Sequence, residues 1–327
     1  MNATDSGFDL AGLCVDVAPQ RPRGATSVNI IDKVSLRPVR SRTTAIVGES
    51  GCGKSLMALA LMGLVDAPLQ VRSGTLRVGD RTFALSDKDA VRPLRGDQLA
   101  MVFQEPMSAL NPVFTIGEQI VEAIVTHAEV GAAAARVDAV GWLKRVGLPD
   151  PQRAFDKFPH ELSGGMKQRA MIAMALAPKP DVLIADEPTT ALDVTVQGQV
   201  LRLLGSLQAE IGLTVLLITH DLALVARHAQ HVAIMYAGRI VETASVRQLF
   251  ANPQHPYTRA LLKCMPARAR RGEPLATISG AVPNPNGFVA GCRFAPRCEF
   301  VTEACATVPP ASQVEDEHLV YCWNVGL

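Results

Sequence analysis

Short apolar runs recur along the chain and predict the strands of an α/β protein. They are rich in aliphatic and β-branched residues, and stretches with helical spacing lie between them. The predicted strands cover residues 43–47, 99–103, 181–185, 213–219 and 231–235. Because strands that alternate with helices usually pair in parallel, we expect a parallel sheet in an α/β core.

Between the second and third predicted strands, the spacing of apolar residues becomes that of a helix. One face of a helix over residues 116–129 would carry Ile116, Ile120, Val121, Ile124 and Val125. An Ala-rich helix over residues 132–148 follows and ends near Gly147 and Pro149. We therefore predict a helical subdomain, at about residues 105–175, inserted into the α/β core.

The periodic pattern ends near residue 250, where Pro, Gly and Arg become frequent, as in "ANPQHPY" and "VPNPNG". A chain of 327 residues is long enough for two domains. We predict a first domain over residues 1–250 and a smaller C-terminal extension over residues 251–327.

Composition and charge narrow the class of protein. Apolar residues make up 48% and charged residues 19% of the chain, which argues for a folded globular protein rather than disorder. The formal net charge of +1 gives no overall field that would attract nucleic acid. No apolar run is long enough to span a membrane, and the N-terminus lacks the pattern of a signal peptide, so we expect a cytosolic protein.

A glycine-rich stretch between the first predicted strand and a helix matches the phosphate-binding loop G-x-x-x-x-G-K-[ST]. It comprises Gly48, Glu49, Ser50, Gly51, Cys52, Gly53, Lys54 and Ser55. The glycines let backbone N–H groups turn toward phosphates, and the following helix adds its positive N-terminal end. Lys54 would reach the β- and γ-phosphates, and the Ser55 hydroxyl would bind Mg²⁺.

Two carboxylates follow the apolar strand at residues 181–185. Asp186 and Glu187 would lie at the carboxyl end of the sheet, where nucleotide sites of parallel sheets form. Asp186 would bind Mg²⁺, directly or through water, and Glu187 would polarise the attacking water. No guanine-reading Asn-Lys-x-Asp motif occurs, so ATP is the expected nucleotide.

A second glycine-rich helix start is found at "LSGGMKQR". Ser163 is a predicted N-cap, and Gly164 and Gly165 open the helix, so this end of the helix would also bind an anion. One ATP does not need two such sites within one chain. Two chains that face each other head to tail would use both.

With this stretch, the chain resembles the ATP-binding-cassette (ABC) ATPases, whose signature is "LSGGMKQR". Other elements of the family occur in order, namely Gln104 in "VFQEP", Asp193 in "ALD" and His220 in "LLITHD". The resemblance covers residues 8 to about 245. It implies a P-loop ATPase core, with a RecA-like sheet and a helical subdomain.

The resemblance also implies roles for these positions. Gln104 would sense the γ-phosphate and Mg²⁺, residues 163–165 would contact the ATP of the opposing chain, His220 would contact the γ-phosphate, and Asp193 would bridge the dimer. Two other interpretations stay open: Gln104 as a strand terminator and His220 as a core histidine. Val17 stands where the family usually stacks an aromatic ring on adenine, so another residue would cover the base or adenine would be held less specifically.

Three further stretches resemble the oligopeptide/dipeptide importer ATPases, at residues 103–120, 252–266 and 291–298. This resemblance implies an ATP-hydrolysing subunit, peripheral at the cytoplasmic face of the cell membrane. Its partners would be a second ATPase subunit, two permease subunits and a periplasmic or extracellular substrate-binding protein. The cargo would be a peptide, or nickel or another small solute. The alternative hypothesis is a soluble ABC-type ATPase regulator with a redox- or metal-sensing C-terminal module.

Four of the seven cysteines lie in the last 36 residues, with spacing C-x5-C-x6-C-x16-C. Cys292, Cys298, Cys305 and Cys322 would suit Zn²⁺ or an iron–sulfur cluster, and unligated thiols are the third possibility. The absence of a close C-x2–4-C pair favours a cluster over zinc. The importer resemblance implies a [4Fe–4S] cluster that stabilises the extension.

Two arginines and one further cysteine carry additional expectations. Arg293 and Arg297 would donate hydrogen bonds toward such a cluster, with solvated side chains as the alternative. Cys52 lies at the start of a helix, which would lower the pKa of its thiol and make it reactive.

Overall fold

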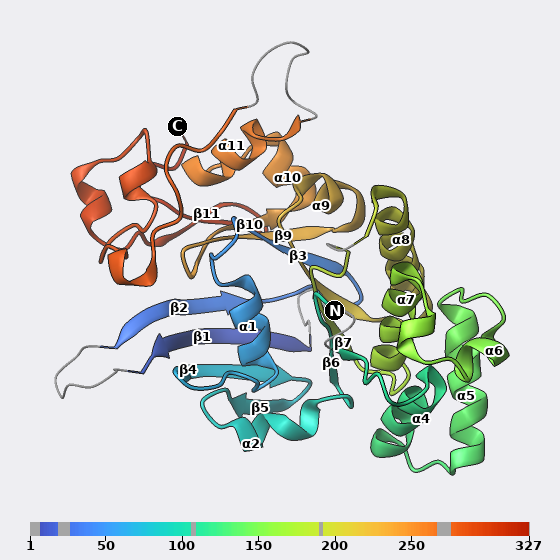
Figure 1. Cartoon of the computed structure of the whole chain (residues 1–327). Helices are drawn as coiled ribbons and strands as arrows, with labels where there is room; N and C mark the ends of the chain where they lie inside the picture. Colours follow the sequence, from blue (N-terminus) through green and yellow to red (C-terminus); the bar gives the residue numbers. More distant parts are fainter. Residues whose placement is uncertain (1–6, 19–26, 106–108, 190–191, 267–275, 327) are drawn as a thin grey trace. The chain divides into compact units, whose positions relative to one another are not determined.

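The structure is a computed structural model that describes residues 7–18, 27–105, 109–189, 192–266 and 276–326 (Figure 1). Residues 106–108, within the importer-like stretch, and residues 190–191, just before Asp193, therefore lie outside the described residues. The chain divides into two compact units. Unit 1 comprises Met1–Val91 and Ile218–Leu327, and unit 2 comprises Arg92–Leu217.

Unit 1 contains an antiparallel sheet that the periodicity analysis did not predict. Its strand order is β2-β1-β4-β5. The strands are β1 (Phe8–Val17), β2 (Val28–Leu36), β4 (Leu69–Val78) and β5 (Arg81–Ala84). Shifts of register interrupt the pairing of β1 with both neighbours, for example between Leu10 and Leu13. Such bulges break the period-two alternation by which a strand is found in a sequence.

The second sheet of unit 1 is mixed rather than purely parallel, so the prediction of a parallel sheet is only partly right. Its strands are in the order β11-β12-β10-β9-β3. They are β3 (Thr43–Val47), β9 (His231–Tyr236), β10 (Arg239–Ser245), β11 (Ala311–Glu315) and β12 (His318–Tyr321). β3 and β9 pair in parallel, whereas β10 pairs antiparallel with β9 and β12. The hairpin of β11 and β12 extends the sheet at β10, where Glu242 pairs with Val320 (Figure 1).

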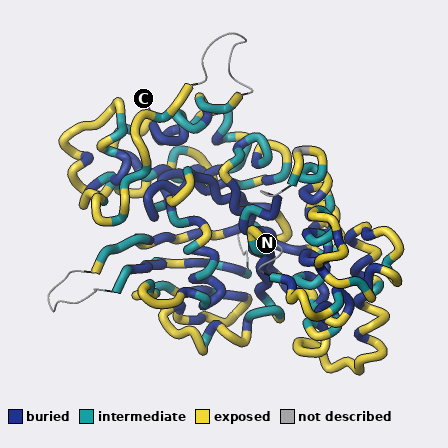
Figure 2. The backbone as a smooth tube through the Cα atoms, in the orientation of Figure 1, coloured by how far each residue is buried: buried dark blue, intermediate teal, exposed yellow. Residues whose placement is uncertain are grey.

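Helices surround these strands in unit 1. They are α1 (Lys54–Leu61), α2 (Lys88–Val91), α9 (Leu222–His228), α10 (Val246–Ala251) and α11 (Pro256–Lys263). Short 3₁₀ turns lie at Pro285–Gly287, Ala295–Arg297 and Glu303–Ala306. Figure 2 shows β9 and β10 mostly buried, whereas much of the chain after α11 is exposed or half-buried. This last part therefore has little apolar core of its own.

A buried carboxylate connects the C-terminal residues to β10. Glu242 accepts hydrogen bonds from the backbone N–H groups of Gln254, at 2.8 Å, and His255, at 2.9 Å. It also lies 2.8 Å from Nε2 of His318 on β12, and both side chains are fully buried. A carboxylate without partners would be very costly at such a site, so these three contacts fix α11 and β12 against the sheet.

Unit 2 begins with the short 3₁₀ turn Arg92–Leu94. Its strands β6 (Leu99–Val102) and β7 (Val182–Asp186) pair in parallel, and β8 (Thr214–Thr219) lies next to β7. The boundary between the units falls inside β8. The helices are α4 (Ile116–His127), α5 (Ala132–Arg145), α6 (Pro151–Phe155), α7 (Gly164–Leu176) and α8 (Val194–Ile211), with a 3₁₀ turn at Pro159–Glu161. Thr115 and Glu118 form a capping box that starts α4.

The five predicted strands are confirmed, with ends that shift by one residue at most. Both predicted helices after residue 115 are also confirmed, and Ile116, Ile120 and Ile124 are buried as expected. Val125 was assigned to the same face but is 40% exposed. Among the described residues, no helix is long and apolar enough to cross a membrane.

Candidate functional site

The loop between β3 and α1 has the backbone conformation that its glycines permit. Gly51 and Gly53 have φ values of 79° and 105°, which residues with side chains rarely adopt. A side chain at Gly48 would collide with the carbonyl oxygen of Met235 on β9. The N-cap of α1 is Gly53 and carries no side-chain cap. The first N–H groups of α1 therefore have no side chain of their own N-cap to bond to.

Lys54 folds over this loop. Its Nζ donates to the carbonyl oxygens of Gly48, at 2.8 Å, and Glu49, at 3.1 Å, and lies 3.7 Å from Sγ of Cys52. Lys54 is buried, whereas Ser50, Gly51 and Ser55 are exposed on the outer side of the loop. The loop therefore places one buried ammonium group and an exposed hydroxyl at the start of α1, which suits phosphate and Mg²⁺.

Cys52 differs from its prediction. Burial raises the pKa of its thiol, and the neighbouring charge of Lys54 only partly offsets this effect. Only 1% of Cys52 is exposed. The prediction of a reactive thiol at this position is therefore wrong, because desolvation outweighs the helix N-terminus and the ammonium group.

In unit 2, the residues after β6 and β7 include two that interact directly. Nε2 of Gln104 donates to Oε2 of Glu187 at 3.2 Å. Asp186 is the last residue of β7 and is 4% exposed. Glu187 has a φ of 43°, a left-handed conformation that is uncommon for a residue with a side chain. Strained backbone of this kind is frequent where a side chain must be held in a functional direction.

The second glycine-rich helix start is the N-terminus of α7. The hydroxyl oxygen of Ser163 accepts a hydrogen bond from the N–H of Met166 at 3.4 Å, which confirms the predicted N-cap. Ser163 and Gly164 are exposed, and a side chain at Gly165 would crowd Val196 of α8. This end of α7 thus presents a hydroxyl and backbone N–H groups to its surroundings.

Asp193 and His220 lie at the ends of other elements. Asp193 is the N-cap of α8 and accepts from the N–H groups of Thr195 and Val196, at 3.0 Å each. His220 follows β8 and is exposed, so the interpretation as a core histidine is wrong. Val17 ends β1 and is half-buried, and residues 19–26 beyond it lie outside the described residues.

The structure thus distributes the predicted nucleotide residues over both units. Residues 48–55 and His220 belong to unit 1. The residues in unit 2 are Gln104, Ser163, Gly164, Gly165, Asp186, Glu187 and Asp193. Among the residues in unit 2, Gln104 and Glu187 are in direct contact.

Two residues near the loop were not predicted as part of the site. The hydroxyl of Tyr257, on α11, accepts from the N–H of Glu49 at 2.9 Å. Arg297 donates to both carboxylate oxygens of Glu49, at 2.8 and 3.1 Å. These partners are 208 and 248 residues from Glu49 along the chain, so no local pattern could have connected them.

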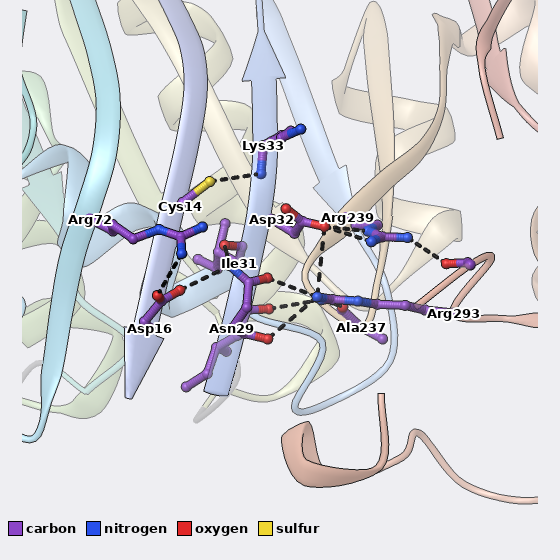
Figure 3. Close-up of polar contacts among 12 residues, drawn as sticks. Cys14, Asp16, Asn29, Ile31, Asp32, Lys33, Arg72, Ala237, Arg239 and Arg293 are labelled. Carbon is purple, nitrogen blue, oxygen red and sulfur yellow. Dashed lines mark hydrogen bonds and ion pairs between the residues drawn. The ribbon is translucent and has the colours of Figure 1, made fainter. Parts of the chain in front are cut away.

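Arg293 and Arg297 do not have the role predicted for them. Arg293 donates to the carbonyl oxygen of Ala237 at 2.5 Å and to Oδ1 of Asn29 at 2.8 Å (Figure 3). Arg297 binds Glu49. Both guanidinium groups are therefore engaged with residues before residue 240, so the prediction of hydrogen bonds to a cluster and the alternative of solvated side chains are both wrong.

The four C-terminal cysteines are near one another, but they do not form a metal site in the structure. Burial raises the pKa of Cys292, and the charges of Cys305 and Cys322 raise it further. Sγ of Cys298 accepts from the N–H of Phe300, and Sγ of Cys322 from that of Asn324, both at 3.4 Å. Across the described residues, no group of three or more His, Cys, Asp or Glu side chains is arranged to hold a metal ion. All seven cysteines are free.

Comparison with protein-family models gives two matches. The ABC transporter model matches residues 31–190, which include both glycine-rich helix starts and the carboxylates after β7. The model of the oligopeptide/dipeptide transporter C-terminal region matches residues 241–305. The second match begins within β10 and includes α11, Arg293 and Arg297.

Individual relatives cover most of the chain. A Brucella abortus (strain 2308) protein named for peptide import and ATP binding is 48% identical over 330 residues, 96% of each chain. The dipeptide transport ATP-binding protein DppD of Escherichia coli (strain K12) is 46% identical over 281 residues, 86% of each chain. Among solved structures, the ATP-binding cassette MJ0796, a dimer in a post-hydrolysis state bound to ADP and Pi, is 26% identical with a TM-score of 0.62. That match covers 73% of this chain and 99% of the cassette.

Proposed function

Since the chain belongs to the ABC transporter ATPases, we propose that it is the ATP-hydrolysing subunit of an importer for dipeptides or oligopeptides. The observation that carries this proposal is the joint occurrence of the loop at residues 48–55 and an importer-type C-terminal region. The names of the relatives support peptides as the cargo. They do not favour the alternative of a soluble regulator, because they name transport subunits.

In this proposal, the chain's own residues have separate tasks around ATP. The loop N–H groups and Lys54 bind the phosphates, since the ammonium group can exchange its two carbonyl partners for phosphate oxygens. The Ser55 hydroxyl, together with Asp186 and Gln104, would hold Mg²⁺, which neutralises phosphate charge when bound. Their oxygen ligands have the chemistry that Mg²⁺ prefers.

Glu187 is the proposed base that takes a proton from the attacking water. The hydrogen bond that Gln104 donates to Glu187 fixes the direction of the Glu187 carboxylate. If Gln104 turned to the γ-phosphate instead, this hydrogen bond would break and Oε2 of Glu187 would become available to the water. His220 would contact the γ-phosphate. The exposure of His220 at the end of β8 supports this role.

The second chain of an ATPase pair would complete the site. We propose that Ser163, Gly164 and Gly165 contact the γ-phosphate of ATP held by the partner, and that Asp193 lies near the dimer interface. The exposed N-terminus of α7 supports this arrangement. ATP binding would close the pair and hydrolysis would reopen it, which drives the permease between two conformations.

The proposed assembly contains a related second ATPase subunit, two permease subunits and a substrate-binding protein. This chain would lie at the cytoplasmic face of the membrane and would not touch the cargo. We also propose the division into residues 1–250, with a helical subdomain at about 105–175, and an extension over residues 251–327. The subdomain would contact the permeases.

Reconstitution of the assembly in proteoliposomes tests this function. ATP hydrolysis should rise when a substrate-binding protein loaded with dipeptide is added, and labelled dipeptide should accumulate inside. If the rate of ATP hydrolysis does not change with the peptide-loaded binding protein but rises with a nickel-loaded one, peptide import would be contradicted and nickel would be favoured as the cargo.

For the four C-terminal cysteines, we propose a [4Fe–4S] cluster as a structural group, with Zn²⁺ as the alternative. The number of thiols supports it, and so does their proximity, since burial raises the pKa of Cys292 and Cys298 and the charges of Cys305 and Cys322 raise it further. Since the described side chains form no metal-holding group, the cysteine side chains would have to be rearranged to hold it. About four irons and four sulfides per chain after anaerobic purification, lost when Cys292, Cys298, Cys305 and Cys322 become Ser, would support the cluster, and the absence of both iron and zinc would exclude it.

A further inference from the structure

The short segment from Gly291 to Cys298, in the C-terminal extension, places two arginines against the structure around the phosphate-binding loop. Arg297 contacts the loop itself through Glu49. Arg293 contacts the turn after β9 and the start of β2 (Figure 3). All of these residues belong to unit 1.

The contact between Arg297 and Glu49 has the geometry of a strong ion pair. Two guanidinium nitrogens face the two carboxylate oxygens at 2.8 and 3.1 Å, the two-pronged arrangement that is specific to arginine. The Arg297 side chain is only 6% exposed and that of Glu49 28%. The charge of Arg297 is thus largely shielded from water and that of Glu49 partly shielded, which makes the pair stronger than one on the open surface.

The surroundings of Arg297 hold it in this direction. Its Nε donates to the carbonyl oxygen of Ser279 at 2.8 Å, and Nη1 lies 3.3 Å from the hydroxyl of Tyr236. The ring of Tyr236 packs edge-on against Tyr257, with centroids 4.7 Å apart. Tyr257 in turn accepts the N–H of Glu49. The extension and α11 therefore hold both the backbone and the carboxylate of Glu49.

Arg293 supports the loop at Cys52 through the turn at residues 237–238. It binds the carbonyl oxygen of Ala237, and the next residue, Gly238, donates its N–H to the carbonyl oxygen of Cys52 at 2.8 Å. A side chain at Gly238 would collide with the carbonyl oxygen of Ile30, so this turn is tightly enclosed. Residues 49 and 52 of the loop are thus both connected to the extension.

The charge of Glu49 makes this arrangement matter for ATP. A carboxylate in the second position of a phosphate-binding loop would repel the phosphates if nothing neutralised it. We propose that Arg297 is a positioning residue for ATP binding: it neutralises Glu49 and holds the loop in its phosphate-binding conformation. This inference rests on the proposed role of residues 48–55 as that loop.

The ion pair predicts an unequal result for its two neutral variants. Arg297→Gln leaves the negative charge of Glu49 beside the phosphates, so the dissociation constant of MgATP should rise about tenfold. Glu49→Gln removes the repelling charge, so the constant should change less than about threefold. The double variant should resemble Glu49→Gln, because no carboxylate is left to repel phosphate.

Titration calorimetry of the full chain in a Glu187→Gln background, which prevents turnover, would measure these constants. Added salt should reduce the effect of Arg297→Gln, because screening weakens repulsion but not a purely structural loss. Arg297→Lys should bind MgATP more tightly than Arg297→Gln but less tightly than the unmodified protein, because lysine keeps the positive charge but cannot form two parallel hydrogen bonds to the carboxylate. Thermal unfolding of each variant would show whether it is folded.

Arg239→Gln provides the matched control. Arg239 forms an ion pair with Asp32 at 2.6 Å and donates to the carbonyl oxygen of Gly291, so its loss loosens the same segment without exposing the charge of Glu49 (Figure 3). Its affinity for MgATP should change less than about threefold. An equal loss in Arg239→Gln and Arg297→Gln, or a double variant as weak as Arg297→Gln, would overturn the proposal.

One further variant separates this inference from the proposed function. If Lys54→Ala binds MgATP as well as the unmodified protein, residues 48–55 are not the phosphate-binding loop and both statements fail. If Lys54→Ala loses binding but Arg297→Gln does not, the loop assignment holds and only the role of Arg297 is refuted.

Discussion

The N-termini of α1 and α7 are both glycine-rich helix starts, yet they are built differently. At α1, Lys54 is buried over the loop, and Tyr257 and Arg297 hold Glu49 from outside it. At α7, Ser163 caps the helix and, like Gly164, is exposed. The first is a site supported from several parts of its own unit. The second offers a hydroxyl and backbone N–H groups, and no lysine or arginine among the described residues of α7 is buried.

This difference is what we would expect if the two helix starts contact different nucleotides. A site with a lysine and a shaped loop can bind the phosphates of a nucleotide on its own side. A helix start that offers a hydroxyl and N–H groups can add to a site whose other half lies elsewhere. The comparison therefore agrees with the proposal that each chain binds ATP at α1 and contacts its partner's ATP through α7.

The largest expected effect concerns ATP hydrolysis, which requires the proposed base Glu187 in addition to the two helix starts. Glu187→Gln should bind MgATP normally but lower turnover about a thousandfold, because glutamine cannot accept the proton of the attacking water. Steady-state phosphate release by the reconstituted assembly would measure this. Glu210→Gln, at a surface ion pair with Arg145 in the same unit, is the control and should hydrolyse normally. Normal turnover in Glu187→Gln would refute its role as the base.

The next largest effect should be at α1. Lys54→Ala removes the charge and the bonds that the ammonium group would give to phosphate, so MgATP affinity should fall about a hundredfold. Titration calorimetry would measure it. Lys88→Ala, which removes an exposed lysine paired with Asp66 in the same unit, should leave affinity unchanged. Comparable affinity in both variants would mean that nucleotide binds elsewhere.

A smaller effect is expected at α7, and on hydrolysis only. Ser163→Ala should lower ATP hydrolysis by the assembly about tenfold, because the hydroxyl would no longer contact the partner's γ-phosphate. It should not change MgATP affinity of the isolated chain. Ser245→Ala is the matched control, since it removes the N-cap of α10 and the same kind of stabilisation. Equal loss of hydrolysis in the two variants would indicate a general loss of stability.

The smallest effect is a dependence of stability on pH that originates at His255, the N-cap of α11, the helix whose Tyr257 contacts the loop before α1. Burial lowers the pKa of His255 to about 3 from its usual 6.5. Between these two pH values, the imidazole of His255 stays neutral in the folded chain but takes up a proton in the unfolded chain. Unfolding free energy should be unaffected above pH 6.5 and fall as the pH drops from 6.5 toward 3, by about 1 kcal/mol at pH 6.

Chemical denaturation at about pH 7.5 and about pH 6 would measure this change. His255→Asn keeps an acceptor for the N–H of Tyr257 but cannot titrate, so its loss of stability between the two pH values should be smaller. If both proteins lose the same amount, His255 does not account for the acid sensitivity.

Much of the nucleotide site could be predicted from the sequence because its signals are local. The strand before Gly48, the glycines of the loop and the helix after it are contiguous, and so are β7 and Asp186. Gln104, Asp193 and His220 were predicted only through the family resemblance, since one residue at the end of a strand has no pattern of its own.

The remaining features depend on contacts between distant parts of the chain. The β2-β1-β4-β5 sheet was missed because bulges break the alternation in β1. The partners of Arg293 and Arg297 were predicted wrongly because their neighbours in sequence are cysteines, whereas their neighbours in space are Ala237 and Glu49. Cys52 was predicted to be reactive because a motif shows the helix start but not the burial around it.

In our proposal, α1 binds the nucleotide of its own chain and α7 contacts the nucleotide of a partner chain. MgATP affinity of the isolated full chain, compared between Lys54→Ala and Ser163→Ala, tests this claim most directly. We expect MgATP affinity to be about a hundredfold weaker in Lys54→Ala and unchanged in Ser163→Ala. Equal weakening in both variants would contradict it, because both helix starts would then hold the same nucleotide.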